Sequence, residues 1–359
     1  MSLSIGIVGL PNVGKSTLFN ALTDNNILAA NYPFATIEPN TGIIAVPDER
    51  LSVLQKMYTA DKVIPATVTF VDIAGLVAGA SKGEGLGNKF LANIRECDAI
   101  AHVVRAFDDP DVTHVHDRVD PIADMDIINT ELILADLQSI ERHIPKLERE
   151  AKANPSARAQ IEELKHLQAE LEAGKLASSV EVSKEVIQSL QLLSAKPVIY
   201  VFNVDEFTLG NEARKSELSA MVAPSDSVFI CAKLEEELRG LTSEDAAELL
   251  ASYDVTEPGL AQLARVAYHT LGLQSYLTAG PKEVRAWTIK QGSTAPQAAG
   301  VIHTDFEKGF IAAAIVDYDD LITAGSEAAA KAAGKLRTEG RDYVMRPGDV
   351  VEFRFNVSK

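Results

Sequence analysis

The stretch Gly9-Leu10-Pro11-Asn12-Val13-Gly14-Lys15-Ser16-Thr17 matches the phosphate-loop pattern G-x-x-x-x-G-K-[ST] at every fixed position. It follows an apolar run at Ser4–Val8, which predicts a buried strand, and a helical pattern begins near Thr17. The two glycines let the loop curl so that its N–H groups point at phosphate oxygens, beside the positive end of the following helix. Lys15 is expected to reach the β- and γ-phosphates and act in catalysis, while Ser16 offers its hydroxyl to Mg²⁺. The loop therefore predicts a site for a nucleoside triphosphate.

Two further motifs have the spacing of a switch-type nucleoside triphosphatase. Asp72-Ile73-Ala74-Gly75 ends a β-branched run at 66–72 and begins 57 residues after Lys15. The Asp72 carboxylate can hold a water on Mg²⁺, and Gly75 lets its N–H approach the γ-phosphate. Thr36 lies in the loop after the first helix, where its hydroxyl can bind Mg²⁺ when a triphosphate is present. With the phosphate loop, these motifs predict two loops that the γ-phosphate orders.

The base-recognition motif departs from the guanine pattern Asn-Lys-x-Asp. After an apolar run, the chain has Asn203-Val204-Asp205-Glu206. Val204 replaces the lysine of the pattern, and Glu206, whose side chain is one methylene longer, replaces the aspartate. The aspartate of that pattern accepts two hydrogen bonds from guanine and repels an acceptor nitrogen of adenine. A carboxylate in a different position therefore binds guanine less well and also discriminates less against adenine. We expect relaxed base choice with ATP favoured; in the alternative, Glu206 still recognises guanine and the protein is a GTPase. Cys231-Ala232-Lys233 is expected to form a second loop beside the base.

The group that positions the attacking water is less clear from the residues. Leu76 follows Gly75, where a glutamine would orient the water, and leucine cannot do so. Either turnover is very slow, or another group acts. His114, in a polar loop after an apolar run, could fold back over the site as that group or be an ordinary surface histidine.

Asn12 could also help to hold a monovalent cation such as K⁺ beside the phosphates.

Strands and helices alternate along the first three quarters of the chain. Apolar runs at 99–104, 198–202 and 227–230 predict further strands, with helical stretches between them. Strands that alternate with helices predict an α/β fold with a mostly parallel sheet.

A helical insertion is expected at about 130–195. Apolar residues are spaced four and three apart along it, which is a heptad pattern: Ile133, Leu137, Ile140, Ile144, Leu147, Leu164, Leu167 and Leu171. The turn signal Asn154-Pro155-Ser156 divides the pattern into two arms of an antiparallel, coiled-coil-like hairpin. Pro145 should kink or shorten the first arm. The hairpin either packs on the sheet domain or projects towards a partner.

The pattern changes near Gly280-Pro281. Beyond it, strands are expected at Val284–Lys290, 310–318 and 350–355, with a helix at Ala295–Ile302. A compact α+β module of about 80 residues is large enough to fold alone. We therefore divide the chain into a nucleotide-binding domain at 1–277 and a second domain at 278–359.

Composition limits the class of protein. Hydrophobic residues make up 46% of the 359 and charged residues 24%, which supports a sizeable core and excludes a disordered chain. No apolar run approaches the ~18 residues of a membrane-spanning helix, and the N-terminus lacks the features of a signal peptide. Cys97 and Cys231 cannot make a disulfide framework. We expect a cytoplasmic protein with no membrane partner.

The charge is distributed unevenly. The net charge is −17, yet residues 278–359 contain 11 Lys and Arg against 11 Asp and Glu, so the negative excess lies in 1–277. An acidic surface repels nucleic acid, and DNA is not an expected partner. Only one basic group in the C-terminal part is compatible with RNA, unless it is merely solvated: Lys331, Lys335, Arg337, Arg341 and Arg346.

Taken together, these motifs closely resemble the YchF, or Obg-like ATPase, family over essentially the whole chain. The resemblance rests on the phosphate loop, Asn31–Asn40, Asp72–Leu76, Asn203–Glu206, the stretch 284–290 and the stretch 300–310. It implies a P-loop, Ras-like G domain with a helical insertion and a C-terminal ubiquitin-like TGS domain of the β-grasp type. It also implies ATP preferred over GTP, dependence on Mg²⁺ and association with the ribosome, through its large subunit or as a whole.

The resemblance also assigns residues. It implies a base contact from Val204 and nucleotide contacts from Asn12, Val13, Gly14, Lys15, Ser16 and Thr17. Gly75 and Asn203, which come from the motifs described above, complete the expected set of nucleotide contacts. It implies Mg²⁺ at Ser16 and Thr36, beside the Asp72 already assigned to the metal, and His114 matches a histidine that the family offers for positioning water.

Our leading hypothesis is a P-loop ATPase whose nucleotide state regulates binding to the ribosome. Two alternatives remain: a GTPase, and a nucleotide-gated ribosome- or RNA-binding module with negligible turnover of its own, which Leu76 would explain.

Overall fold

The computed structural model describes residues 3–24, 40–73, 86–109, 119–151 and 155–356. They form two compact units. The first contains the described parts of 1–43 and residues from 69 to 266, and the second contains 44–68 and the described residues from 267 onward. The division differs from the expected domains at 1–277 and 278–359, because residues 44–68 join the C-terminal unit and the chain passes between units near residue 266.

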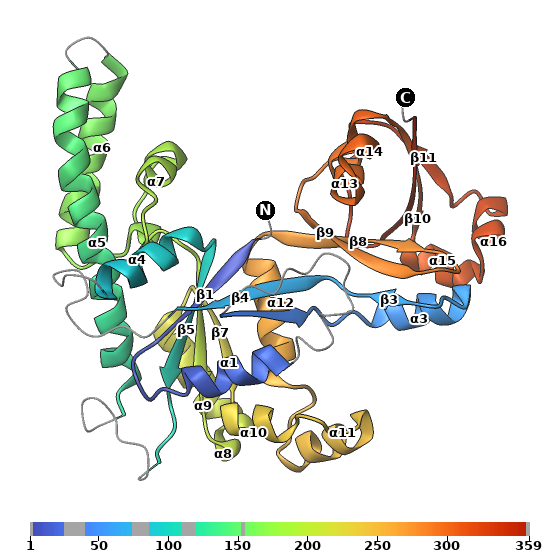
Figure 1. The fold of residues 1–359 in the computed structure, drawn as a ribbon, viewed down its shortest axis with the longest axis horizontal. Helices are drawn as coiled ribbons and strands as arrows, with labels where there is room; N and C mark the ends of the chain where they lie inside the picture. The colour runs from blue at the N-terminus through green and yellow to red at the C-terminus, as the bar shows by residue number, and fades with distance from the viewer. Residues whose placement is uncertain (1–2, 25–39, 74–85, 110–118, 152–154, 357–359) are drawn as a thin grey trace. The chain divides into compact units, whose positions relative to one another are not determined.

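The first unit is built on a six-stranded sheet in the order β2-β4-β1-β5-β6-β7 (Figure 1). From β4 to β7 every neighbouring pair is parallel, as predicted for an α/β fold. The predicted strands are present to within one residue at either end. The six strands are β1 (Ser4–Val8), β2 (Thr41–Ala45), β4 (Thr67–Asp72), β5 (Ala99–Arg105), β6 (Val198–Asn203) and β7 (Asp226–Ile230).

The central strands form because their residues are apolar throughout. Every residue of β5 is buried, and β6 is buried from Ile199 to its end. Strands of a parallel sheet that are covered on both faces have such continuous apolar sequences. Since the pairs are parallel, the segments that follow β1, β4, β5, β6 and β7 all leave from the same edge of the sheet. Residues far apart in the sequence are therefore brought to one edge.

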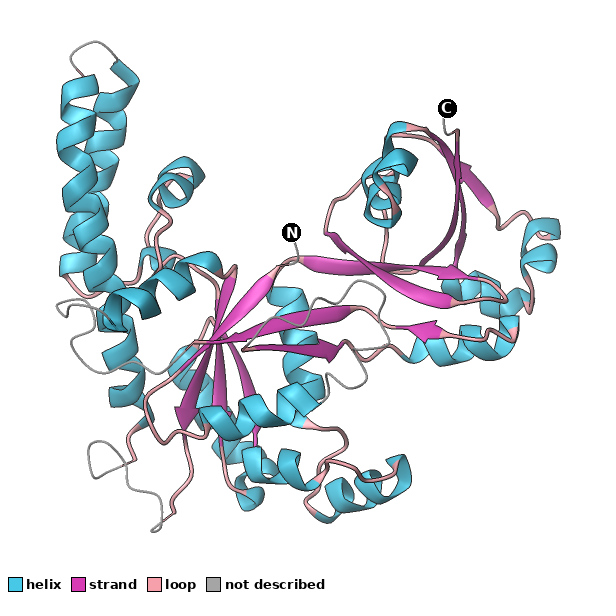
Figure 2. Cartoon of the chain, in the orientation of Figure 1, coloured by secondary structure: helices cyan, strands magenta, loops and turns pink. Residues whose placement is uncertain are grey.

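Helices connect these strands and cover the sheet, as Figure 2 shows. In the first unit they are α1 (Lys15–Asp24), α4 (Leu86–Glu96), α5 (Pro121–Glu150), α6 (Pro155–Glu172), η1 (Ala177–Ser179), α7 (Lys184–Leu190), α8 (Glu206–Leu209), α9 (Glu212–Val222), α10 (Ala232–Glu237), α11 (Ser243–Ser252) and most of α12 (Gly259–Thr270).

The predicted helical hairpin is the long pair α5 and α6 (Figure 1). Its heptad residues form one buried cluster, in which Ile140 and Leu167 have no exposed surface. Pro145 does not shorten the first arm, since α5 continues to Glu150. Tertiary packing between the two helices offsets the hydrogen bond that the proline removes.

The second unit contains a mixed sheet in the order β11-β10-β12-β8-β9-β3. The hairpin β8–β9 is antiparallel, and the last strand β12 lies parallel to β8, which with the helix α13 is a β-grasp arrangement. The strands are β3 (Val63–Ile64), β8 (Leu273–Ala279), β9 (Val284–Lys290), β10 (Phe310–Asp317), β11 (Arg337–Glu339) and β12 (Asp349–Phe355). The helices are α3 (Glu49–Tyr58), α13 (Ala295–Ile302), α14 (Thr304–Lys308), α15 (Tyr318–Ala324) and α16 (Glu327–Ala332).

Residues 44–68 join this unit through specific contacts. β3 adds to the edge of the sheet as a parallel neighbour of β9. The Arg50 guanidinium pairs with Asp48 at 2.7 Å and donates to the backbone carbonyl of Pro347. An early segment of the chain thus completes the C-terminal module.

Candidate functional site

The phosphate loop has the backbone that its two glycines predict. Asn12 and Gly14 both have positive φ, at 62° and 89°, so the loop turns sharply before α1 begins. A Cβ on Gly9 would lie 2.7 Å from the carbonyl oxygen of Val103, and one on Gly14 would collide with the amide of Asn203. Neither position has room for a side chain. The loop therefore packs closely against β5 and the end of β6, which leaves only glycine room at these two positions.

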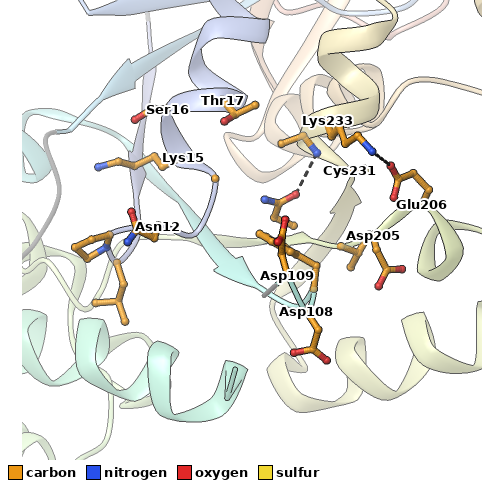
Figure 3. A pocket seen from close by; sticks show the side chains of 17 residues that line it. Asn12, Lys15, Ser16, Thr17, Asp108, Asp109, Asp205, Glu206, Cys231 and Lys233 are labelled. Atoms are coloured by element: carbon orange, nitrogen blue, oxygen red, sulfur yellow. Dashed lines mark hydrogen bonds and ion pairs between the residues drawn. The ribbon is translucent and has the colours of Figure 1, made fainter. Parts of the chain in front are cut away.

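A cavity of about 670 Å³ opens at this edge of the sheet (Figure 3). Its walls come from segments that follow four strands: the phosphate loop, 107–109, 203–206 and 231–233. Among the predicted contact residues, Asn12, Gly14, Lys15, Ser16 and Thr17 line the cavity. The Val13 side chain is buried in the core with 1% of its surface exposed, so its predicted contact with a nucleotide would be made by the backbone.

Lys15 lies beside the end of β4. Its ammonium donates to the carbonyl of Ile73 at 2.8 Å and lies 3.9 Å from the Asp72 carboxylate. Burial lowers the pKa of Lys15, and the nearby charge of Asp72 partly opposes that shift. An ammonium that has lost most of its water gains from an added negative charge, which a phosphate would supply.

Asp72 and Ser16 offer oxygen ligands for a divalent cation. Within the described part of the chain, Asp72 Oδ1 is buried and has no hydrogen-bond partner. An acceptor oxygen without a donor suits a hard cation or its water, and Mg²⁺ binds through one or two such groups plus phosphate. The described residues contain no cluster of three or more His, Cys, Asp or Glu side chains that could hold a metal without phosphate. The buried acceptor oxygen of Asp72 and the Ser16 hydroxyl at the cavity are what Mg²⁺ bound together with a nucleotide would require.

Several predicted residues cannot be placed. Thr36, Gly75, Leu76 and His114 lie outside the described residues. Their assigned roles remain predictions.

Asn203 joins three segments of the site. Its side-chain amide donates to the carbonyl of Val13 at 2.9 Å, and its side-chain oxygen accepts from the N–H of Ala232 at 3.1 Å. The residue is buried, so both bonds are protected from water. Val204 follows with its N–H bonded to the carbonyl of Ile230 and its side chain in the core. The loops that would surround a base are thereby tied to the phosphate loop.

The second loop beside the base is also anchored from behind. It continues into α10, where the buried carboxylate of Glu235 accepts from the N–H of Gly259 at 2.6 Å. Burial raises the pKa of Glu235 to about 7, and the hydrogen bonds from the start of α12 oppose that shift. The same glycine is tightly packed, since a Cβ there would lie 2.9 Å from Ile230.

Residues 107–109 were missed by the sequence reasoning. Phe107, Asp108 and Asp109 line the cavity although they carry no motif. Arg105 at the end of β5 shapes this segment: it is 1% exposed and donates to the carbonyls of Phe107 at 3.2 Å and Asp109 at 3.3 Å. The available signal was the arginine at the end of an apolar strand that lies next to the phosphate-loop strand.

Comparisons with known proteins place the chain. Residues 4–135 match a family described as "50S ribosome-binding GTPase", and residues 273–356 match the C-terminal domain of YchF GTPases, described as a protein of unknown function. A protein of Haemophilus influenzae named "Ribosome-binding ATPase YchF" is 51% identical over 99% of this chain and all of its own length. A Bacillus subtilis protein of the same name is 50% identical over the same shares.

The chain belongs to the YchF family. A solved structure described as the "Schizosaccharomyces pombe YchF GTPase" agrees, with a TM-score of 0.87 and 40% identity over 98% of each chain. The predicted YchF resemblance and the P-loop α/β fold with a distinct C-terminal module are confirmed. The YchF nucleotide-binding domain belongs to a class of nucleotide hydrolases. In the described residues, no helix combines the length and hydrophobicity that crossing a bilayer requires.

Proposed function

We propose that this protein hydrolyses ATP to ADP and phosphate with Mg²⁺, and that its nucleotide state controls binding to the ribosome. The observation that carries the proposal is the phosphate-loop cavity, in which the Lys15 ammonium lies beside Ile73 and Asp72. The relatives named ribosome-binding ATPases support the choice of ATP and of the ribosome.

The phosphate end of the cavity would perform the chemistry. The loop N–H groups and Lys15 bind the phosphates and stabilise negative charge on the transferring phosphoryl group. Ser16 and Asp72 would hold Mg²⁺, with Thr36 as the third candidate. When bound, Mg²⁺ offsets charge on the phosphate oxygens. Gly75 would sense the γ-phosphate, and His114 would position the attacking water because Leu76 cannot. Asn12 remains our candidate for holding K⁺.

The base end would determine which nucleotide binds. Asn203 fixes the position of the loop at 231–233, and because the Val204 side chain packs in the core, we infer that Val204 would meet a base through its backbone. A pocket that offers backbone groups tolerates adenine as well as guanine. The guanine alternative is supported by the family matched at residues 4–135 and by the S. pombe relative, both of which are described as GTPases.

The basic group in the C-terminal unit gives limited support for binding RNA. Lys335 pairs with Asp320 at 3.0 Å, Arg337 lies 3.7 Å from the buried Asp349, and Arg341 donates to the carbonyl of Phe310. Charges that are paired within the protein have less to offer to phosphates. We therefore propose that ribosome contact uses the α5–α6 hairpin as well as this unit.

The decisive test is the variant Lys15→Ala. Phosphate release from ATP should fall by about a thousandfold or more, since the variant loses the charge that contacts the transferring group. Lys165→Ala on the exposed face of α6 is the matched control and should keep full activity. Unchanged turnover in Lys15→Ala would refute the site.

Two further measurements separate the alternatives. Competition between ATP and GTP for binding distinguishes an ATPase from a GTPase. Turnover with and without ribosomes, combined with co-sedimentation in ATP-analogue and ADP states, distinguishes a regulated hydrolase from a passive module: the passive module predicts no stimulation.

A further inference from the structure

An ion pair spans the two loops at the base end of the cavity. The Lys233 ammonium lies 3.0 Å from Oε1 of Glu206, and Figure 3 shows the two side chains pointing toward one another. Glu206 is the first residue of α8 and Lys233 the second of α10, and both line the cavity. The pair thus joins the motif at 203–206 to the loop at 231–233 where a base would lie.

Both partners are charged at neutral pH. The pKa of Glu206 is lowered first by a hydrogen bond from its own backbone N–H and then by Lys233. The pKa of Lys233 is raised by Glu206. The carboxylate therefore already has the Lys233 ammonium as a donor within the protein.

The other carboxylate of the motif is also occupied. Asp205 caps α8, and its Oδ1 accepts from the N–H of Thr208 at 2.7 Å. Each acid of the motif therefore already accepts a donor from the protein at one of its oxygens.

The two purines differ in what they ask of such a carboxylate. The edge of guanine has two neighbouring donors, a ring N–H and an amino group, which a free carboxylate can accept together. Adenine has an acceptor nitrogen at the first of these places, which a carboxylate repels. A carboxylate can only accept, and an ammonium can only donate. Neutralising the acid with a lysine therefore weakens guanine binding and lessens the penalty against adenine.

We propose that Lys233 is a specificity-determining residue: by holding the Glu206 carboxylate, it keeps that group from accepting the two donors of guanine. The inference rests on the proposed preference for ATP and supplies a cause for it in this chain. It also assigns a function to the cavity-lining Lys233 beyond membership of a base-contact loop.

The test compares affinities for non-hydrolysable analogues of ATP and GTP by calorimetry. Lys233→Met keeps the length of the side chain but frees Glu206, and it should raise GTP affinity relative to ATP roughly tenfold, the effect of one hydrogen bond to a charged group. Lys233→Arg keeps the pair and should keep the wild-type ratio. Both residues are accessible to solvent, so the variants should fold, and their melting temperatures should match that of the wild type.

The double variant decides whether Glu206 is the reason. In a Glu206→Gln background, Lys233→Met should leave the ratio of affinities unchanged. A Lys233→Met ratio equal to that of the wild type, or a shift that persists without Glu206, would overturn the inference while leaving an ATP-preferring wild type intact. A wild type that binds GTP more tightly than ATP would overturn the proposed function and this inference together.

Discussion

The phosphate end and the base end of the cavity satisfy their polar groups in different ways. At the phosphate end, Lys15 contacts a backbone carbonyl, and the buried Oδ1 of Asp72 has no hydrogen-bond partner in the described residues. At the base end, Asn203 makes two buried hydrogen bonds and Glu206 pairs with Lys233. The phosphate end thus has a buried polar oxygen that is open to a ligand, whereas the polar groups named at the base end are paired with other groups of the protein. Substitutions at the two ends should therefore fail differently.

The largest effect on turnover among the three variants that follow is expected at Asp72. Asp72→Ala removes a carboxylate that we propose binds Mg²⁺. Turnover should therefore fall by about 10- to 100-fold, and the Mg²⁺ concentration that gives the half-maximal rate should rise. Stability should change little, because the loss of a buried oxygen that has no hydrogen bond is set against the loss of the counter-charge 3.9 Å from Lys15. Asp61→Ala, at an exposed position, is the control. A strongly destabilised Asp72→Ala protein with a normal Mg²⁺ requirement would contradict the contrast.

A smaller effect on turnover, with a larger cost in stability, is expected at Asn203. Asn203→Ala leaves the Val13 carbonyl and the Ala232 N–H without their buried partner, which costs about 2–4 kcal/mol of unfolding free energy. Nucleotide affinity should fall about tenfold because the base loops lose their tie to the phosphate loop. Urea unfolding and calorimetry measure the two quantities.

Asn211 provides a matched control for that variant. It also accepts a backbone hydrogen bond, as the N-cap of α9, but it does not line the cavity. Asn211→Ala should cost about 1 kcal/mol and leave nucleotide affinity unchanged. If both asparagine variants lowered nucleotide affinity equally, the hydrogen bonds of Asn203 would not be what holds the base end in its binding arrangement.

The smallest effect on turnover is expected at Glu235, which should change the pH dependence of stability. Its folded pKa of about 7 lies above the value of 4.5 in the unfolded chain, so the folded state holds the proton more tightly. The stabilisation is fully present below pH 4.5 and is lost as the pH rises to about 7. Glu235→Gln removes this dependence.

Unfolding free energies measured at pH 5 and pH 8 check the sign. Relative to Glu235→Gln, the wild type should lose up to about 3 kcal/mol over that interval. A wild type that instead gained stability relative to the variant would show that the carboxylate is ionised and well paired in the fold.

The sequence predicted what depends on local pattern. Continuous apolar runs identified the strands of the parallel sheet because both of their faces are covered. The heptad spacing identified the α5–α6 hairpin. The phosphate loop was predictable because its two glycines satisfy a backbone requirement within nine residues. Pro145 was expected to kink or shorten its helix; it does not shorten it, because packing along the rest of the arm keeps the arm helical to Glu150.

The remaining features depend on contacts between distant segments. Glu206 and Lys233 are both visible in the sequence, but their pairing follows from strands β6 and β7 being neighbours. Phe107–Asp109 line the cavity for the same kind of reason, because β5 lies beside β1. The two-residue strand Val63–Ile64 is too short to give a periodic signal. Its place in the C-terminal sheet could not be predicted from pattern.

That short strand has a consequence for the order in which the molecule can be made. Val63 and Ile64 pair with Val284 and Arg285, and Arg50 contacts Pro347. Residues 50–64 can therefore make these contacts only after residues more than 200 positions later have been synthesised. Pairings this distant are slow to form, and synthesis at about 5–20 residues per second separates them by many seconds. A nascent chain that stops before residue 284 therefore exposes an unpaired β-edge, the kind of surface on which chaperones act and from which aggregates grow.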